Sequence, residues 1–180
     1  LRRTAETSGT ATMRAFARYC EGEVHLDRQP DAAAAALEEA VQLARSVDNQ
    51  LVYGVSLVCL ASLQGRRGRS DRALPLFREA VAHWCRLGNH THQLTTLRNL
   101  VELLAQLGEH RSAAIIYGAV TGGGAPSFGA EAQRLAAAWQ QVQHHLGVEQ
   151  AEQLVAKGRR LDPTRRGDEA LTQLDLLLRQ

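Results

Sequence analysis

The sequence predicts an all-α fold, an α-α superhelix of stacked helical hairpins with about nine helices. The first supporting observation is a motif that recurs with a constant step of 40 residues, in which a bulky residue follows an alanine by four positions. The alanines are Ala33, Ala73 and Ala113, and the bulky residues are Leu37, Phe77 and Tyr117. Such spacing places both on one helical face, where the alanine lets a second helix approach and the bulky residue fills the gap. Three recurrences are about the minimum for a stable stack, because one hairpin cannot bury its own apolar face.

The second observation is composition. Alanine and leucine supply most of the apolar residues, and both favour helix over strand. No segment shows the alternation of polar and apolar residues that is typical of a strand. The prediction is therefore a protein made of helices alone.

The individual helices are expected between clear turn signals. The expected ranges are 10–24, 31–47, 51–64, 71–87, 92–107, 108–120, 128–146, 148–161 and 167–178. Asp31 and Asp71 are the expected N-caps, and Pro75 is expected in a first turn, where its missing N–H costs least. The first helix has its apolar residues on one side: Met13, Phe16, Ala17, Cys20 and Val24. Residues 51–64 are apolar nearly all round, which predicts a helix buried on several sides.

Three parts of the chain are expected. Residues 1–120 hold the helical repeats, residues 121–127 form a linker rich in glycine, and residues 128–180 form a helical capping region. Because the first residue is Leu1, we expect a piece of a longer polypeptide. The three widely spaced cysteines fit reduced thiols in a cytoplasmic protein, and no window is apolar enough for a membrane span. A net charge of +2 favours neither nucleic acid nor an anionic membrane as partner.

The middle of the chain resembles the tetratricopeptide repeat (TPR), a helix–turn–helix unit. The residues that carry the resemblance are Leu57, Leu60, Ala61, Gly68, Ala73, Phe77 and Ala80. The match departs at Gln64 and Cys85, where the family usually has tyrosine and proline. The step of 40 residues also exceeds the roughly 34 residues of that repeat. A TPR-like fold is what this resemblance implies.

Four short motifs toward the C-terminus add a second resemblance. They are Ala-Ala-Ile-Ile-Tyr-Gly-Ala at 113–119, Leu-Gly at 146–147, Ala-Lys-Gly-Arg-Arg-Leu at 156–161 and Asp-Glu-Ala at 168–170. Their order is similar to the end of the helical region in LuxR-type and SARP-type bacterial transcriptional regulators, including STAND ATPase and cyclase-linked relatives from actinobacteria. The resemblance covers residues 28–178 and implies the sensor or scaffold arm of such a regulator. Nothing in the chain matches the ATPase, the cyclase or the DNA-reading helix of those proteins.

Candidate chemical sites are sparse. His83, Cys85, His90 and His92 crowd one helix end without the spacing of a known zinc site, and His144 and His145 are adjacent in the chain. The glycines at 122–124 lack the lysine and hydroxyl residue of a phosphate-binding loop. The acidic pairs at 38–39 and 168–169 lie in no identifiable cleft. We therefore expect no catalytic residue, no metal and no cofactor.

A polar stripe on the helix 92–107 is the predicted binding surface. It consists of Thr95, Arg98, Asn99, Glu102 and Gln106. First helices of such repeats line a concave groove, so the stripe is expected to hold a protein partner, a neighbouring domain of the same chain or a peptide. An ordinary solvent-exposed face is the structural alternative for the same stripe.

Two other functions remain open at this point. One is the binding of a small-molecule effector in the groove, as in a sensor domain. The other is direct contact with DNA through two arginine patches, although nucleic acid is the less favoured partner. The patches are Arg66, Arg67, Arg69 and Arg72, and Arg159, Arg160, Arg165 and Arg166.

Overall fold

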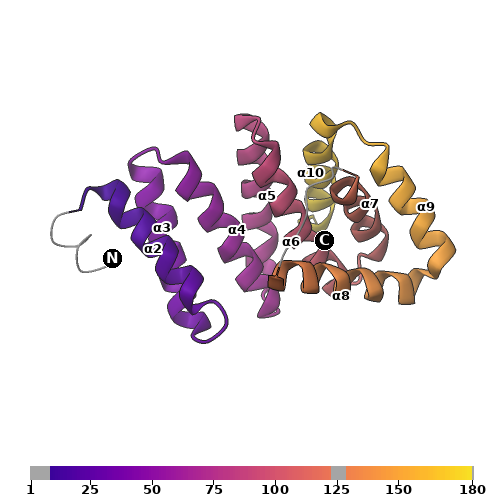
Figure 1. The fold of residues 1–180 in the computed structure, drawn as a ribbon, viewed down its shortest axis with the longest axis horizontal. Coiled ribbons are helices and arrows are strands. Elements are labelled where there is room, and N and C mark those ends of the chain that lie inside the picture. The colour runs from indigo at the N-terminus through magenta and orange to yellow at the C-terminus, as the bar shows by residue number, and fades with distance from the viewer. Residues whose placement is uncertain (1–8, 123–128, 180) are drawn as a thin grey trace. The chain divides into compact units, whose positions relative to one another are not determined.

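The computed structural model of the chain describes residues 9–122 and 129–179. Every regular element within these ranges is helical, which confirms the all-α, TPR-like prediction (Figure 1). The elements are α2 (Ala11–His25), α3 (Pro30–Ser46), α4 (Gln50–Arg66), α5 (Ser70–Leu87), α6 (His90–Gln106), α7 (His110–Thr121), α8 (Gly129–Leu146), α9 (Val148–Arg159), η1 (Pro163–Arg165) and α10 (Arg166–Leu177). The chain divides into two compact units, Leu1–Leu76 and Phe77–Gln180. Each unit is described by itself.

The repeat of 40 residues is visible in the helix starts and in the turns. α3, α5 and α7 begin at residues 30, 70 and 110, and α4 and α6 begin at residues 50 and 90. Asn49 and Asn89 cap α4 and α6 in the same way, each accepting a hydrogen bond from the backbone N–H three residues on. Before them, Asp48 and Gly88 both adopt a left-handed backbone, with φ of 54° and 64°. The turn geometry therefore repeats together with the helices.

The motif alanines and their bulky partners are buried as expected. Ala33, Ala73 and Ala113 have no exposed surface, and neither have Leu37 and Phe77. The third bulky residue, Tyr117, is half-buried. Its ring stacks on that of Trp139, with centroids 4.4 Å apart.

Both expected N-caps are wrong by two residues. α3 begins at Pro30 and α5 begins at Ser70, so Asp31 and Asp71 lie inside the first turns of their helices. In α3 the reason is Pro30, whose fixed φ suits the first helical position. Acidic residues in a first turn still interact favourably with the helix dipole. Pro75 consequently lies in the interior of α5 instead of its first turn.

In the N-terminal unit, α3 packs between α2 and α4. Ala33, Ala34 and Leu37 of α3 form a core cluster with Leu60 and Leu63 of α4. α4 is buried around most of its circumference, as its apolar sequence predicts.

The apolar side predicted for α2 is only partly buried. Met13, Phe16 and Val24 are 52%, 50% and 75% exposed, whereas Ala17 is 6% exposed. α2 meets α3 at Gly22, whose missing side chain leaves room for Leu37: a Cβ at Gly22 would lie 2.5 Å from the Leu37 Cγ atom. This close approach of two helices at a glycine contributes to the orientation of α2.

In the C-terminal unit, α6 and α7 form a hairpin, and α9 packs closely against α7. α8 contacts both α6 and α7 and runs across them instead of continuing the hairpin pattern (Figure 1). The predicted linker at 121–127 falls largely on residues 123–128, which lie outside the described residues. The proposed division of the chain at this linker stays a prediction.

α10 returns toward the start of the unit. Arg78 of α5 forms an ion pair with Asp175, and Ser112 of α7 donates a hydrogen bond of 2.7 Å to Gln173. α10 is therefore tied to both α5 and α7.

Candidate functional site

The predicted stripe lies along α6 in the C-terminal unit, and its members differ in exposure. Arg98 is buried, with 6% of its side chain exposed, whereas Gln106 is exposed and the other three are half-buried. Thr95 and Asn99 are engaged by their own helix, because the Asn99 side-chain amide donates to the Thr95 carbonyl over 2.9 Å. The stripe is therefore not uniformly exposed to solvent.

α8 supplies partners for three sites on α6. An Arg98 nitrogen lies 3.9 Å from Glu131, and the Arg134 Nε atom lies 3.2 Å from a Glu102 carboxylate oxygen. Seven residues after Arg134 on α8, the Gln141 side chain donates a hydrogen bond of 3.0 Å to the carbonyl of Ala105. The stripe and α8 thus form one polar interface inside the C-terminal unit.

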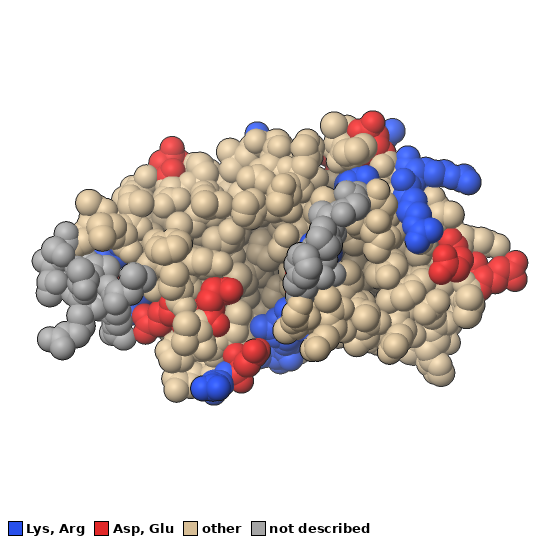
Figure 2. Space-filling model, in the orientation of Figure 1, with Lys and Arg blue, Asp and Glu red and all other residues tan. Residues whose placement is uncertain are grey.

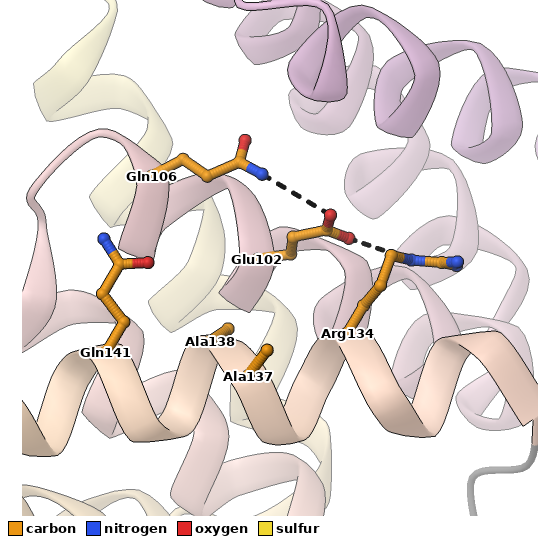
Figure 3. A pocket seen from close by; sticks show the side chains of 6 residues that line it. All are labelled: Glu102, Gln106, Arg134, Ala137, Ala138 and Gln141. Atoms are coloured by element: carbon orange, nitrogen blue, oxygen red, sulfur yellow. Dashed lines mark hydrogen bonds and ion pairs between the residues drawn. The ribbon is translucent and has the colours of Figure 1, made fainter.

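A small pocket opens where α6 and α8 meet (Figure 3). Its volume is about 150 Å³, and its lining consists of Glu102, Gln106, Arg134, Ala137, Ala138 and Gln141. The two alanines of α8 leave the space, and the Gln106 amide lies 3.5 Å from the Glu102 carboxylate (Figure 3). Ligand sites for drug-sized molecules are about 300–1,000 Å³, so this pocket fits one side chain of a larger partner better than a whole cofactor.

The chemistry of the pocket is that of recognition. It offers a carboxylate already paired with a guanidinium and two carboxamides, and it contains no cysteine, serine or histidine that could act as a nucleophile or base. Carboxamides and charged pairs bind backbone amides and polar side chains through hydrogen bonds. The arrangement can hold a polar partner in a defined orientation.

Glu131, Arg134 and Gln141 are site residues that sequence reasoning missed. Each is a common surface residue on an alanine-rich helix, and the 40-residue repeat does not extend to α8. The spacing of Glu131 and Arg134, three residues apart on one helix face, was the available signal. The spacing of Glu131 and Arg134 does not indicate which other helix this face of α8 contacts.

A histidine contact lies beside this interface. The rings of His110, at the start of α7, and His145, near the end of α8, are stacked with centroids 4.1 Å apart. His144 meets His145 edge to face. Burial, together with the nearby His145, lowers the pKa of His110, while Glu109 opposes this shift. The neutral form of His110 is therefore favoured at this junction.

Two of the other histidines singled out in the sequence pack against Trp84, whereas His90 is exposed. The rings of His83 and His92 contact Trp84 with centroids 4.8 and 4.7 Å away, and Gln93 donates to the sulfur of Cys85. Within residues 9–122 and 129–179, no three histidine, cysteine or acidic side chains gather in a way that could hold a metal ion.

The two arginine patches are less uniform than the sequence suggests. In the first, Arg67 forms an ion pair with Asp31. In the second, Arg166 is only 8% exposed, whereas Arg159, Arg160 and Arg165 are exposed. Figure 2 shows basic and acidic side chains close to one another over the face in view. No large surface of one charge sign results on that face.

Comparison with known families supports the repeat assignment. Residues 52–120, from α4 to the end of α7, match the tetratricopeptide repeat family. The match includes α6 and therefore the whole stripe. No curated protein and no solved structure matches the chain.

TPR units generally mediate protein–protein interaction, and helical repeats of this kind are typically non-catalytic. Among the described helices, none combines the length and apolar character needed to cross a bilayer. The family match supports a scaffold role in protein–protein interaction.

Proposed function

We propose that the chain is a non-catalytic interaction or sensor scaffold whose TPR helix α6 binds a protein partner, a domain of its own chain or a peptide. The binding surface is the stripe Thr95, Arg98, Asn99, Glu102 and Gln106. The observation that carries this proposal is the set of polar groups on a TPR helix that are ordered by α8 and end at an open pocket. Ordered groups lose little conformational entropy on binding, which favours a specific partner.

The biological setting is the finer part of the proposal. We propose a cytoplasmic LuxR-type or SARP-type bacterial regulator, STAND ATPase or cyclase-linked, of the actinobacterial kind. The support is the ordered set of four motifs at 113–119, 146–147, 156–161 and 168–170. Gly118 of the first motif and Gly158 of the third pack α7 against α9. Two of the motifs therefore contribute to the close packing of these two helices.

A site-specific photocrosslinker tests the binding surface. Placed at Gln106 in cells that make the full protein, it should capture a partner that a crosslinker at Gln42, exposed on α3, does not capture. The purified partner should then bind the chain, and Glu102→Arg should weaken that binding by about tenfold or more. Equal capture at both positions, or binding that Glu102→Arg leaves unchanged, contradicts the proposal.

The second candidate function is the binding of a small-molecule effector. The pocket between α6 and α8, of about 150 Å³, would admit a small group of such a ligand, and its carboxylate and two carboxamides could hydrogen-bond that group. A thermal-shift screen of polar metabolites should find a stabilising compound whose effect disappears in Gln106→Ala. A stabilisation that persists in this variant assigns the compound to another site.

A further inference from the structure

α8 and α9 are attached to the rest of the C-terminal unit in different ways. α9 meets α7 backbone to backbone, because Gly118 and Gly158 leave no side chain between the two helices. α8 buries Leu135, Ala138 and Val142, stacks Trp139 on Tyr117 of α7, and meets α6 largely through charged and amide side chains. It has no backbone-to-backbone contact like that of α9, and its side-chain contacts can be exchanged for those of another helix. We therefore expect α8 to be the more readily displaced of the two helices.

The polar contacts of α8 form a pattern that another helix can reproduce. A carboxylate at Glu131 faces Arg98, and a guanidinium three residues later, at Arg134, faces Glu102. Seven residues further, Gln141 reaches the backbone of α6. Offsets of three and seven residues return to the same side of a helix, and an extended peptide does not keep this spacing.

We propose that the stripe on α6 recognises an amphipathic α-helix carrying a carboxylate and a guanidinium one turn apart among small residues, and that α8 occupies this place until such a helix displaces it. This inference rests on the proposed function, because it names the partner class and the regulation of the same surface. α8 then acts as an internal competitor of the partner. The observed affinity equals the intrinsic affinity of the stripe multiplied by the fraction of molecules in which α8 is displaced.

The first step of the test measures the release of α8 in the full chain by hydrogen exchange. Arg134→Glu places two carboxylates side by side at Glu102, so exchange in residues 129–146 should accelerate roughly fivefold while α9 stays unchanged. The matched control is Gln133→Glu, a new carboxylate on the exposed side of α8. Adding Glu102→Arg to Arg134→Glu restores opposite charges and should restore protection.

The second step uses a synthetic peptide of residues 129–146 as the partner helix. The peptide should bind the Arg134→Glu chain roughly fivefold tighter than the unaltered chain, because the internal competitor is weakened. A peptide that itself carries Arg134→Glu should lose this binding. Unchanged exchange in α8, equal exchange acceleration in α8 and α9, or equal peptide affinity for both chains each overturns the inference.

The outcomes separate this inference from the proposed function. If the peptide binds as expected but the crosslinker at Gln106 captures nothing specific, the proposed function fails and the helix-binding property stands. If a captured partner binds Arg134→Glu no tighter than the unaltered chain, the surface binds partners without displacement of α8, and the inference alone fails.

Discussion

Gly118 of α7 and Gly158 of α9 each lie against the backbone of the opposite helix. A Cβ at Gly118 would contact the carbonyl of Val155, and a Cβ at Gly158 would contact the carbonyl of Ile115. Both glycines belong to the sequence motifs that suggest a bacterial regulator. Their shared role is structural, because they let α7 and α9 pack closely and so hold α9 in position.

The close approach predicts that Gly158→Ala destabilises the protein by about 1–3 kcal/mol in urea unfolding, because backbone atoms do not move aside for a methyl group. Without a clash, replacing glycine by alanine inside a helix stabilises by roughly 0.5–1 kcal/mol, so the sign of the effect is diagnostic. Gly167→Ala is the matched control, because its Cβ would meet the side-chain ends of Cys85 and Gln93, which can rotate. A Gly158→Ala protein as stable as the control contradicts the backbone contact.

The repeated turn predicts opposite effects at equivalent positions. Asp48 and Gly88 share a left-handed backbone, which an L-residue adopts at a cost and glycine adopts freely. Asp48→Gly should therefore stabilise by about 0.5 kcal/mol, even though the exposed hydrogen bond from the Gln50 amide is lost. Gly88→Asp should destabilise by a similar amount, as measured by the midpoint of thermal unfolding. Changes of the same sign in the two variants rule out a shared turn geometry.

The contact between His110 and His145 predicts a loss of stability on acidification. Because the folded-state pKa of His110 is lowered from its ordinary value of 6.5, the unfolded chain takes up a proton first. The contribution is fully present above pH 6.5 and is lost as the pH falls through the lower folded-state pKa. The positive end of the dipole of α7 adds to this preference for neutral His110.

Thermal unfolding at a series of pH values checks this expectation. The variant His110→Gln keeps a polar side chain without the titration, so it should lose less stability between about pH 7 and pH 5.5 than the unaltered protein. Parallel curves for the unaltered and His110→Gln proteins contradict the assignment.

The docking of α10 predicts slow modification of Cys85. Burial raises the pKa of the Cys85 thiol, which reduces the reactive thiolate, and the position of Gly167 covers its sulfur. In a Cys20→Ser, Cys59→Ser background, Asp175→Lys should accelerate alkylation about threefold, because the ion pair with Arg78 becomes a repulsion. Thr172→Lys, exposed on the same helix, should not change the rate. Equal alkylation rates in the two variants would show that the docking of α10 does not control the reactivity of Cys85.

The sequence predicted the repeats well, because their signals are local. The step of 40 residues identified Ala33, Ala73 and Ala113, all fully buried, and the helices begin with the same step. The errors at Asp31 and Asp71 are shifts of one or two residues, the usual uncertainty at helix ends. Residues within one repeat contact each other through short sequence separations, which a pattern can reveal.

The interface of α8 was beyond sequence reasoning. The polar stripe on α6 indicated a face that is not apolar, but the burial of Arg98 depends on tertiary packing such as its contact with Glu131, 33 positions away in the chain. The exposure of Met13 and Phe16 on α2 was missed for a related reason. Apolar residues indicate a side that can be buried, whereas contacts such as that of Gly22 with Leu37 depend on how the helices pack. Pairings between distant segments leave no periodic trace.

The lengths of α6 and α8 bear on how long a partner helix must be. α6 has 17 residues and α8 has 18, so at a rise of about 1.5 Å per residue each measures roughly 26 Å. The contacts of α8 with α6 run from Glu131 to Gln141, a span of roughly 15 Å or about three helical turns. On the proposed function, a partner helix shorter than about three turns could not make all of these contacts, so its length as well as its charge would affect binding.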